Sequence, residues 1–119
     1  MDKLTKIEII TRPSKFEALK QELAKIDVSG LTVTSALGCG LQKGLTENYR
    51  GIKREINMIE RIKVEIVVCK VPVEAVVEAA RKICHTGKPG DGKIFIYEIA
   101  NAIKIRTGEE SCAALQNDR

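Results

Sequence analysis

Two successive strand–helix–strand patterns dominate this chain, and their order restricts the folds that it can adopt. Alternating apolar residues predict strands, whereas apolar residues three or four positions apart predict helices. The predicted elements are, in order, a strand at 4–11, a helix at 14–27, a strand at 31–38, a strand at 61–68, a helix at 72–86 and a strand at 94–99. This order predicts an α+β, ferredoxin-like β-α-β-β-α-β antiparallel sheet with both helices on one face.

Local signals define the helix boundaries. Ser14 and Glu17 match the S-x-x-E capping box, which satisfies two backbone donors at a helix start. Pro72 suits the first turn of the second helix, because its missing N–H needs no partner there. The alternating segment 103–106 predicts a short fifth strand with Lys104 and Arg106 on the same side.

The stretch 38–60 separates the two patterns and differs from both. Gly38, Gly40, Gly44 and Gly51 interrupt it, charged residues are frequent, and its apolar period is weak. A long loop inside a compact domain is more often functional than filler. We therefore expect an extended, mobile recognition loop.

Length and composition fit a single domain over residues 1–119. The chain is 44% hydrophobic and 30% charged, and a chain of this length can bury a core without metals or disulfides. The formal net charge of +4 favours anionic ligands. The apolar strands need cover on the sheet face opposite the helices, which favours a homo-oligomer.

The cysteines carry no metal signature. Cys39, Cys69, Cys84 and Cys112 lack C-x-x-C spacing, and the N-terminal stretch holds no apolar run typical of a signal peptide or membrane span. We expect each cysteine to be a small buried hydrophobe in a protein of the reducing cytoplasm. We expect no direct membrane insertion.

The glycine-rich segment 86–94 is the most specific local motif. Its residues from Gly87 to Lys93 match most of a Walker A loop, but Ile94 stands where Ser or Thr would bind magnesium. The segment also leads from a helix into a strand, so it is not a P-loop NTPase motif. Its glycines still expose N–H groups and Lys93 can reach an oxyanion, although a plain β-turn is the alternative.

Catalytic machinery has little support in the sequence. His85 is the single histidine, and the chain has neither a nucleophilic triad pattern nor an H-E-x-x-H motif. Glu109 and Glu110 form a carboxylate pair only within a polar tail. The sequence therefore favours a binding protein over an enzyme.

Several separated segments resemble the PII nitrogen-regulatory signal proteins. The similar segments are TGKPGDGKIF at 86–95, IRTGE at 105–109, LTVT at 31–34, GCGLQKG at 38–44, YRG at 49–51 and KVEIVV at 63–68. The resemblance runs without a gap from about residue 3 to residue 115. It implies a homotrimer of ferredoxin-like subunits that is not an enzyme and that binds ATP or ADP in each cleft between neighbours.

The resemblance also implies roles for individual residues. Glu65 and the Val67 backbone would hold adenine, with Thr32 nearby. The glycine-rich segment would hold phosphates, and the C-terminal loop and tail at 103–115 would reach a neighbouring subunit. The implied nucleotide-contacting residues are Thr32, Gly38, Gly40, Leu41, Glu65, Val67, Gly87, Gly90, Asp91, Gly92, Lys93, Lys104 and Arg106.

By the same resemblance, 38–60 is the T-loop, the arm that docks partner proteins. Mg²⁺ would accompany ATP with Gln42 as its ligand, and the 2-oxoglutarate residues would be Arg12, Gln42, Lys43 and Arg61. Tyr49 and Arg50 would contact the partner. That partner would be an ammonium transporter, another transporter, or an enzyme or regulator of nitrogen metabolism. A transporter would recruit the cytoplasmic protein to a membrane.

Some positions depart from the family pattern. The tyrosine that relatives uridylylate falls at Arg54, which excludes that modification there. Leu41 and Lys104 stand where relatives use arginines, so the preference for ATP over ADP is expected to be weaker.

Two alternative functions stay open. One is an adenylate-only sensor that regulates a transporter without a 2-oxoglutarate response. The other is a ferredoxin-like RNA-binding module with Phe95 and Tyr97 as stacking residues, although no nucleic acid is the expected partner.

Overall fold

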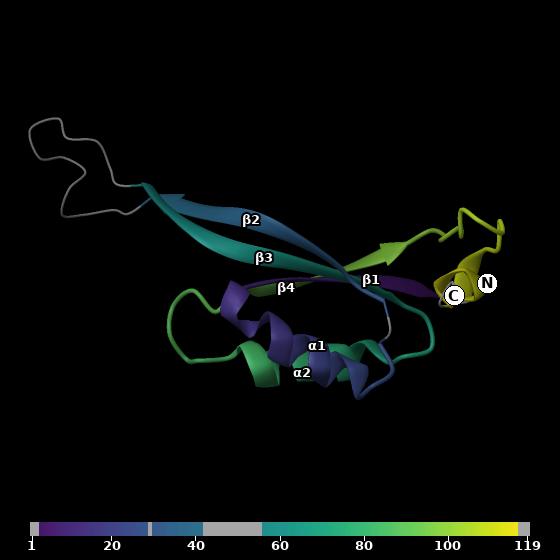
Figure 1. Cartoon of the computed structure of the whole chain (residues 1–119), viewed down its shortest axis with the longest axis horizontal. Coiled ribbons are helices and arrows are strands. Elements are labelled where there is room, and N and C mark those ends of the chain that lie inside the picture. The colour runs from purple at the N-terminus through teal and green to yellow at the C-terminus, as the bar shows by residue number, and fades with distance from the viewer. Residues whose placement is uncertain (1–2, 29, 42–55, 117–119) are drawn as a thin grey trace, which may run out of the picture.

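A four-stranded antiparallel sheet with two helices forms the body of the protein (Figure 1). The computed structural model describes residues 3–28, 30–41 and 56–116. Its elements are β1 (Leu4–Thr11), the 3-10 turn η1 (Pro13–Lys15), α1 (Phe16–Ala24), β2 (Thr32–Leu41), β3 (Ile56–Val68), α2 (Val73–Cys84), β4 (Lys93–Ile99) and the 3-10 turn η2 (Ser111–Leu115). The strand order β2-β3-β1-β4 confirms the predicted ferredoxin-like fold.

Both helices cover the same face of the sheet, where the core lies (Figure 1). Ile7 and Ile9 alternate along β1, the strand between β3 and β4, and are almost fully buried because residues of α1 and α2 pack over this face. Leu19 and Leu23, one turn apart on α1, are fully buried against them. Among the described residues, no helix has the length and apolar character needed to cross a bilayer.

The opposite face of the sheet keeps apolar side chains exposed. On β4, Phe95 pairs with Glu8 and Tyr97 pairs with Lys6. Their side chains therefore lie on the sheet face opposite to that of Ile7 and Ile9. Phe95 and Tyr97 are each 42% exposed, and the Lys6 ammonium lies 4.5 Å from the centre of the Tyr97 ring. This uncovered face is the one that the sequence predicted to need a partner.

The first helix is shorter than the predicted 14–27, and the capping box is wrong. Ser14 lies inside the 3-10 turn η1, and no side chain caps either η1 or α1. A capping residue needs an extended backbone, which Ser14 lacks within a helical turn. The helix ends at Ala24, and the chain then turns through Asp27 at a φ of 67°.

Strand pairing extends further into 38–60 than the sequence predicted. Gly38 to Leu41 pair with Ile59 to Ile56, so both ends of the expected loop belong to β2 and β3. Ladder hydrogen bonds use only backbone groups, so glycines and charges can continue a pair of strands without an apolar period. The central part of the expected T-loop, 42–55, lies outside the described residues.

The predicted fifth strand at 103–106 is also wrong. Ile103 makes one isolated bridge to Glu110, and residues 105–107 form a turn. The Lys104 N–H donates to Glu109 at 2.8 Å, and the Gly108 N–H donates back to Lys104 at 2.8 Å. Gly108 has a φ of 78°, which only glycine adopts easily, so the chain reverses here instead of continuing as a strand.

Candidate functional site

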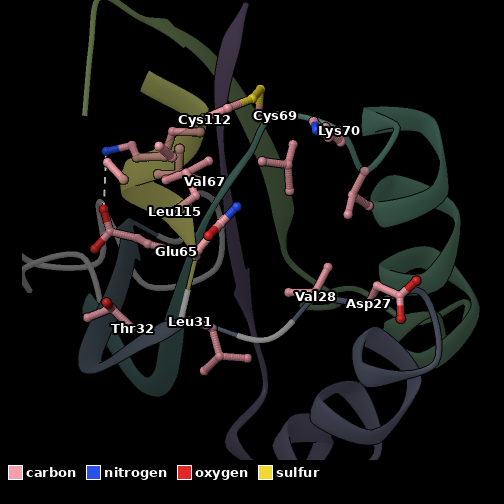
Figure 2. Close-up of a pocket in the computed structure, with 17 residues that line it drawn as sticks. Asp27, Val28, Leu31, Thr32, Glu65, Val67, Cys69, Lys70, Cys112 and Leu115 are labelled. Atoms are coloured by element: carbon pink, nitrogen blue, oxygen red, sulfur yellow. Dashed lines mark hydrogen bonds and ion pairs between the residues drawn. A yellow bond between two sulfur atoms is a disulfide. The ribbon is translucent and has the colours of Figure 1, made fainter. Parts of the chain in front are cut away.

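A pocket of about 970 Å³ lies where β3 ends and β2 begins (Figure 2). Thr32 and Glu65 are register partners on β2 and β3, and both line it with Val67. The Lys6 ammonium donates to Glu65 Oε2 at 3.1 Å, and this hydrogen bond raises the pKa of Lys6. The three residues predicted to hold adenine therefore lie together in one pocket.

The C-terminal segment forms one wall of this pocket. Residues 112–116 line it, and a disulfide joins Cys112 to Cys69 at the end of β3, with Cα atoms 5.7 Å apart (Figure 2). The expectation that every cysteine is a small buried hydrophobe holds for Cys84 but not for this pair or for the exposed Cys39. Cys69 and Cys112 are 43 residues apart, so no local spacing could reveal their pairing.

The glycine-rich segment is organised around the Asp91 carboxylate. Its Oδ2 accepts the backbone N–H groups of Thr86 at 2.8 Å and Gly87 at 3.0 Å, and its Oδ1 accepts from the Thr86 hydroxyl and from Arg12. The Arg12 guanidinium, followed by the Thr86 hydrogen bonds, holds the pKa of Asp91 well below its usual range. The Gly87 amide, which was expected to face phosphate, thus binds a carboxylate of the chain itself.

The segment is also fixed to the end of β1. Arg12 Nη2 donates to the Pro89 carbonyl at 3.0 Å, and the Thr11 hydroxyl donates to the Asp91 carbonyl at 3.1 Å. Gly92 packs so closely that a Cβ there would lie 1.8 Å from the Ile10 carbonyl oxygen, at a φ of 106°. Side-chain hydrogen bonds and close packing against β1 therefore hold this loop in one conformation.

Two guanidinium groups converge on this segment. A Cβ at Gly90 would lie 3.1 Å from Nη2 of Arg61 and 3.2 Å from Nη2 of Arg12. Arg61 Nη1 donates to the Glu60 carbonyl at 3.0 Å. Lys93 is exposed at the start of β4. Arg12 and Arg61, which were predicted to bind 2-oxoglutarate, thus lie beside the glycine-rich segment 86–94, which was predicted to bind phosphate. We call this region, with Lys93, the cationic corner.

The other predicted residues that the structure describes lie on β2 or in the C-terminal segment. Gly38, Gly40 and Leu41 belong to the outer half of β2, and a Cβ at Gly38 would lie 3.5 Å from Cγ of Arg61. Lys104 lies in the C-terminal reversal, with its ammonium 3.5 Å from Glu109 Oε1. The Thr107 hydrogen bond, followed by the Lys104 charge, lowers the pKa of Glu109. Arg106 lies in the same turn. The remaining predicted residues, Gln42, Lys43, Tyr49 and Arg50, lie outside the described residues.

The pocket and the cationic corner occupy opposite ends of β1. Thr5 pairs with Val68 beside the pocket, whereas Thr11 contacts Asp91. Six residues of strand correspond to about 20 Å at ~3.3 Å per residue. Figure 1 shows the same arrangement, with the loop between α2 and β4 at one end of the sheet and the C-terminus at the other. Within the described part of the chain, no three His, Cys, Asp or Glu side chains gather as a metal site.

Comparisons with known proteins agree on one family. A family model described as nitrogen regulatory protein P-II matches residues 4–109. The nitrogen regulatory PII-like protein of Bacillus subtilis is 62% identical over 110 residues, which are 92% of this chain and 95% of that protein. The B. subtilis GlnK–ATP complex has a TM-score of 0.85 at 60% identity, covering 94% of this chain and 97% of that chain. Arabidopsis thaliana PII bound to citrate has a TM-score of 0.77 at 33% identity, and the match covers 95% of this chain and 92% of that chain.

Proposed function

Because this chain belongs to the nitrogen regulatory protein P-II family, whose members are regulatory proteins and not enzymes, we propose that it senses adenylate nucleotides and 2-oxoglutarate. In this proposal ATP or ADP binds at the subunit interfaces of a homotrimer. The whole chain acts as one domain, with the T-loop at 38–60, the phosphate loop at 86–94 and the C-terminal loop and tail at 103–115. The protein works in the cytoplasm and regulates partners in nitrogen metabolism through the T-loop.

The observation that carries nucleotide binding is the preformed phosphate loop beside Arg12 and Arg61. A loop that is already ordered binds an anion without a large ordering cost, and guanidinium groups favour phosphate and carboxylate oxygens. The 60% identical GlnK is known in complex with ATP, which supports the same ligand here. Gly90 and Lys93 would contact phosphates, and Asp91 would hold the loop in shape through the N–H groups of Thr86 and Gly87.

Adenine would occupy the pocket between β2 and β3. Glu65 and the Val67 backbone would recognise its polar edge, and Thr32 would contact it from the neighbouring strand. The Lys6 ammonium lies 3.1 Å from Glu65 Oε2, so the two charges of this ion pair offset each other. The position therefore suits a neutral base.

The separation of the two regions supports a site shared between subunits. The pocket of one subunit and the phosphate loop of the next would hold the two ends of one nucleotide. Lys104 and Arg106 would reach the phosphates from the subunit that supplies the pocket, and Gly38, Gly40 and Leu41 would line the site from β2. The uncovered sheet face with Phe95 and Tyr97 is the surface that we propose is buried between subunits.

2-Oxoglutarate would bind beside magnesium-ATP. Magnesium commonly bridges substrate phosphates and one or two protein ligands, a role that we assign to the ATP phosphates and Gln42. Arg12, Lys43 and Arg61 would contact the carboxylates of 2-oxoglutarate. A guanidinium has five N–H donors, so Arg12 and Arg61 keep donors beyond those used by Asp91, Pro89 and Glu60. A PII relative binds citrate, also a small polycarboxylate.

The T-loop would turn ligand binding into regulation. Ligands shift the population of loop conformations only by their difference in affinity for them. Tyr49 and Arg50 would contact an ammonium transporter, another transporter, or a nitrogen-metabolism enzyme or regulator, and a transporter would bring the protein to the membrane.

An adenylate-only sensor is a second candidate. Leu41 supplies no charge at a position where arginine is expected, and part of the Arg12 guanidinium is committed to Asp91 and Pro89. Both features reduce the cation available to 2-oxoglutarate. The family match gives no support to the RNA-binding alternative.

Calorimetric titration tests the proposal. ATP and ADP should bind the wild-type protein, and 2-oxoglutarate should bind only with ATP and Mg²⁺ present. Lys93→Ala should weaken ATP binding about tenfold or more, because it removes a cation from the phosphates. Lys20→Ala, on the exposed side of α1, is the control and should bind like wild type. Nucleotide binding without any 2-oxoglutarate binding would favour the adenylate-only sensor, and no nucleotide binding would refute both.

A further inference from the structure

The Cys69–Cys112 disulfide joins the end of β3 to the C-terminal turn η2. Both residues also line the pocket between β2 and β3 (Figure 2). Each is half-buried, so a small thiol reagent can reach the bond. The bond is therefore both accessible and in contact with the proposed nucleotide site.

Few hydrogen bonds attach η2 to the body of the protein. The Ser111 N–H donates to the Ala102 carbonyl at 2.9 Å and to Asn101 Oδ1 at 3.1 Å, which fixes the start of the turn. Beyond it, within the part of the chain that the structure describes, no hydrogen bond joins residues 112–115 to the sheet. The disulfide is the covalent attachment of this segment, in addition to the packing of its partly buried side chains.

The docked segment also contains unfavourable features. Ser111 has a φ of 59°, a conformation that residues other than glycine adopt at a cost. Its hydroxyl oxygen is buried and has no hydrogen-bond partner among the described residues. Such a segment stays docked only while its surroundings hold it, and the disulfide is a covalent restraint among them.

We propose that Cys69 and Cys112 form a reversible thiol–disulfide exchange site that controls whether the C-terminal segment encloses the nucleotide pocket. A dithiol reductant transfers two electrons and two protons to the disulfide, which becomes two thiols while the dithiol becomes a disulfide. A disulfide oxidant such as glutathione disulfide reverses the reaction and is itself reduced to thiols. In a reducing compartment a disulfide of this kind is typically transient and redox-sensing.

Two physical effects connect the bond to nucleotide affinity. The oxidised form holds residues 112–116 as a wall of the pocket. It also anchors the end of the reversal that carries Lys104 and Arg106, only a few residues before Cys112. Reduction removes the covalent anchor of the wall and leaves the reversal to its own hydrogen bonds and other non-covalent contacts, so a nucleotide must then hold both in place at an entropic cost. This effect on nucleotide rests on the proposed function, whereas the tethering of the segment does not.

The test compares oxidised and reduced full-length protein. Glutathione disulfide and dithiothreitol prepare the two forms, and alkylation with peptide mass spectrometry identifies the bonded cysteines. Calorimetry should find that ATP binds the reduced form about tenfold more weakly. Hydrogen exchange should find residues 103–116 faster in the reduced form.

Matched variants assign the effect to this bond. Cys112→Ser should behave like the reduced wild type under both conditions, and Cys69→Ser should reproduce it from the other side of the bond. Cys39→Ser, which changes an exposed free cysteine, should keep the full redox response.

Three outcomes would overturn the proposal. One is free Cys69 and Cys112 thiols after oxidation; another is a redox response that persists in Cys112→Ser. The third is identical ATP affinity in the two forms. If neither form binds ATP, the proposed function fails, and hydrogen exchange then decides the tether: faster exchange at 103–116 on reduction supports it, and unchanged exchange refutes it.

Discussion

The Asp91 carboxylate binds four donor groups, three within the glycine-rich segment 86–94 and one, the Arg12 guanidinium, just after β1. It accepts from Arg12, from the Thr86 hydroxyl and from the N–H groups of Thr86 and Gly87. The sequence predicted both Arg12 and Asp91 as site residues, but it assigned them to different ligands. Arg12 thus acts first as a partner of the loop, and any ligand of this corner meets a guanidinium that is already held in position.

We predict an acid-dependent contribution of Asp91 to stability. Because its pKa is lowered in the folded protein, the ionised carboxylate stabilises the fold above the ordinary Asp pKa of about 3.9, and this stabilisation is lost as the pH falls below that value. Asp91→Asn should therefore melt at a lower temperature than wild type at pH 7, and the difference should shrink in acid. Thermal unfolding of both proteins between pH 7 and pH 3 measures it, and a constant difference would contradict this assignment.

We predict that Gly92 tolerates no side chain. In Gly92→Ala the Cβ would collide with the Ile10 carbonyl, at 1.8 Å, in a backbone conformation that L residues avoid. The expected loss is about 3 kcal/mol or more of unfolding free energy. Gly108→Ala is the matched control, because its φ is also positive at 78° but nothing lies within 4 Å, and it should lose only about 1 kcal/mol. Equal losses in chemical denaturation would remove the close approach as the cause.

At the scale of elements, regular hydrophobic periods predicted the fold well. The strands at 4–11 and 61–68 and the helix after Pro72 all lie where alternation or helical spacing indicated them. The errors fall where pairing depends on backbone geometry. The β2–β3 ladder continues through Gly38 and Cys39 without an apolar period, and the turn after Ile103 follows from the positive φ of Gly108. The Cys69–Cys112 bond depends on tertiary contact, which local sequence does not encode.

We predict that α1 contributes to stability mainly through its buried face. Leu19 is fully buried between α1 and the sheet, so Leu19→Ala should lose about 3 kcal/mol of unfolding free energy. Gln21→Ala, two positions further on the exposed side of the same helix, should change it by less than about 0.5 kcal/mol. Urea unfolding distinguishes them, and similar losses would mean that the helix is stabilised by something other than this packing.

At the scale of the molecule, one sheet face is covered by helices and the other is not. Our proposal of a site completed by a second subunit is based on the exposed Phe95 and Tyr97 of the uncovered face and on the separation of the pocket from the cationic corner. Sequence periodicity indicated the uncovered face, but the distance between the two halves of the site emerged only from the fold.

We predict that a charge on this face disrupts assembly. Tyr97→Glu would bury a carboxylate in the proposed interface, where it would compete with Glu65 for the Lys6 ammonium and where desolvation is costly. Size-exclusion chromatography with light scattering should find wild type at three times the chain mass of 13.1 kDa and the variant at a lower mass. Glu98→Gln, the next residue but on the other face of β4, should remain assembled like wild type. A trimeric Tyr97→Glu protein would place the interface elsewhere.

Native mass spectrometry with ATP, Mg²⁺ and 2-oxoglutarate tests the proposed shared site, because one spectrum counts subunits and ligands together. We expect a trimer that binds up to three ATP molecules, and up to three 2-oxoglutarate molecules only when ATP and Mg²⁺ are also present. A monomer that binds ATP on its own, or a trimer that binds no nucleotide, would contradict the shared site.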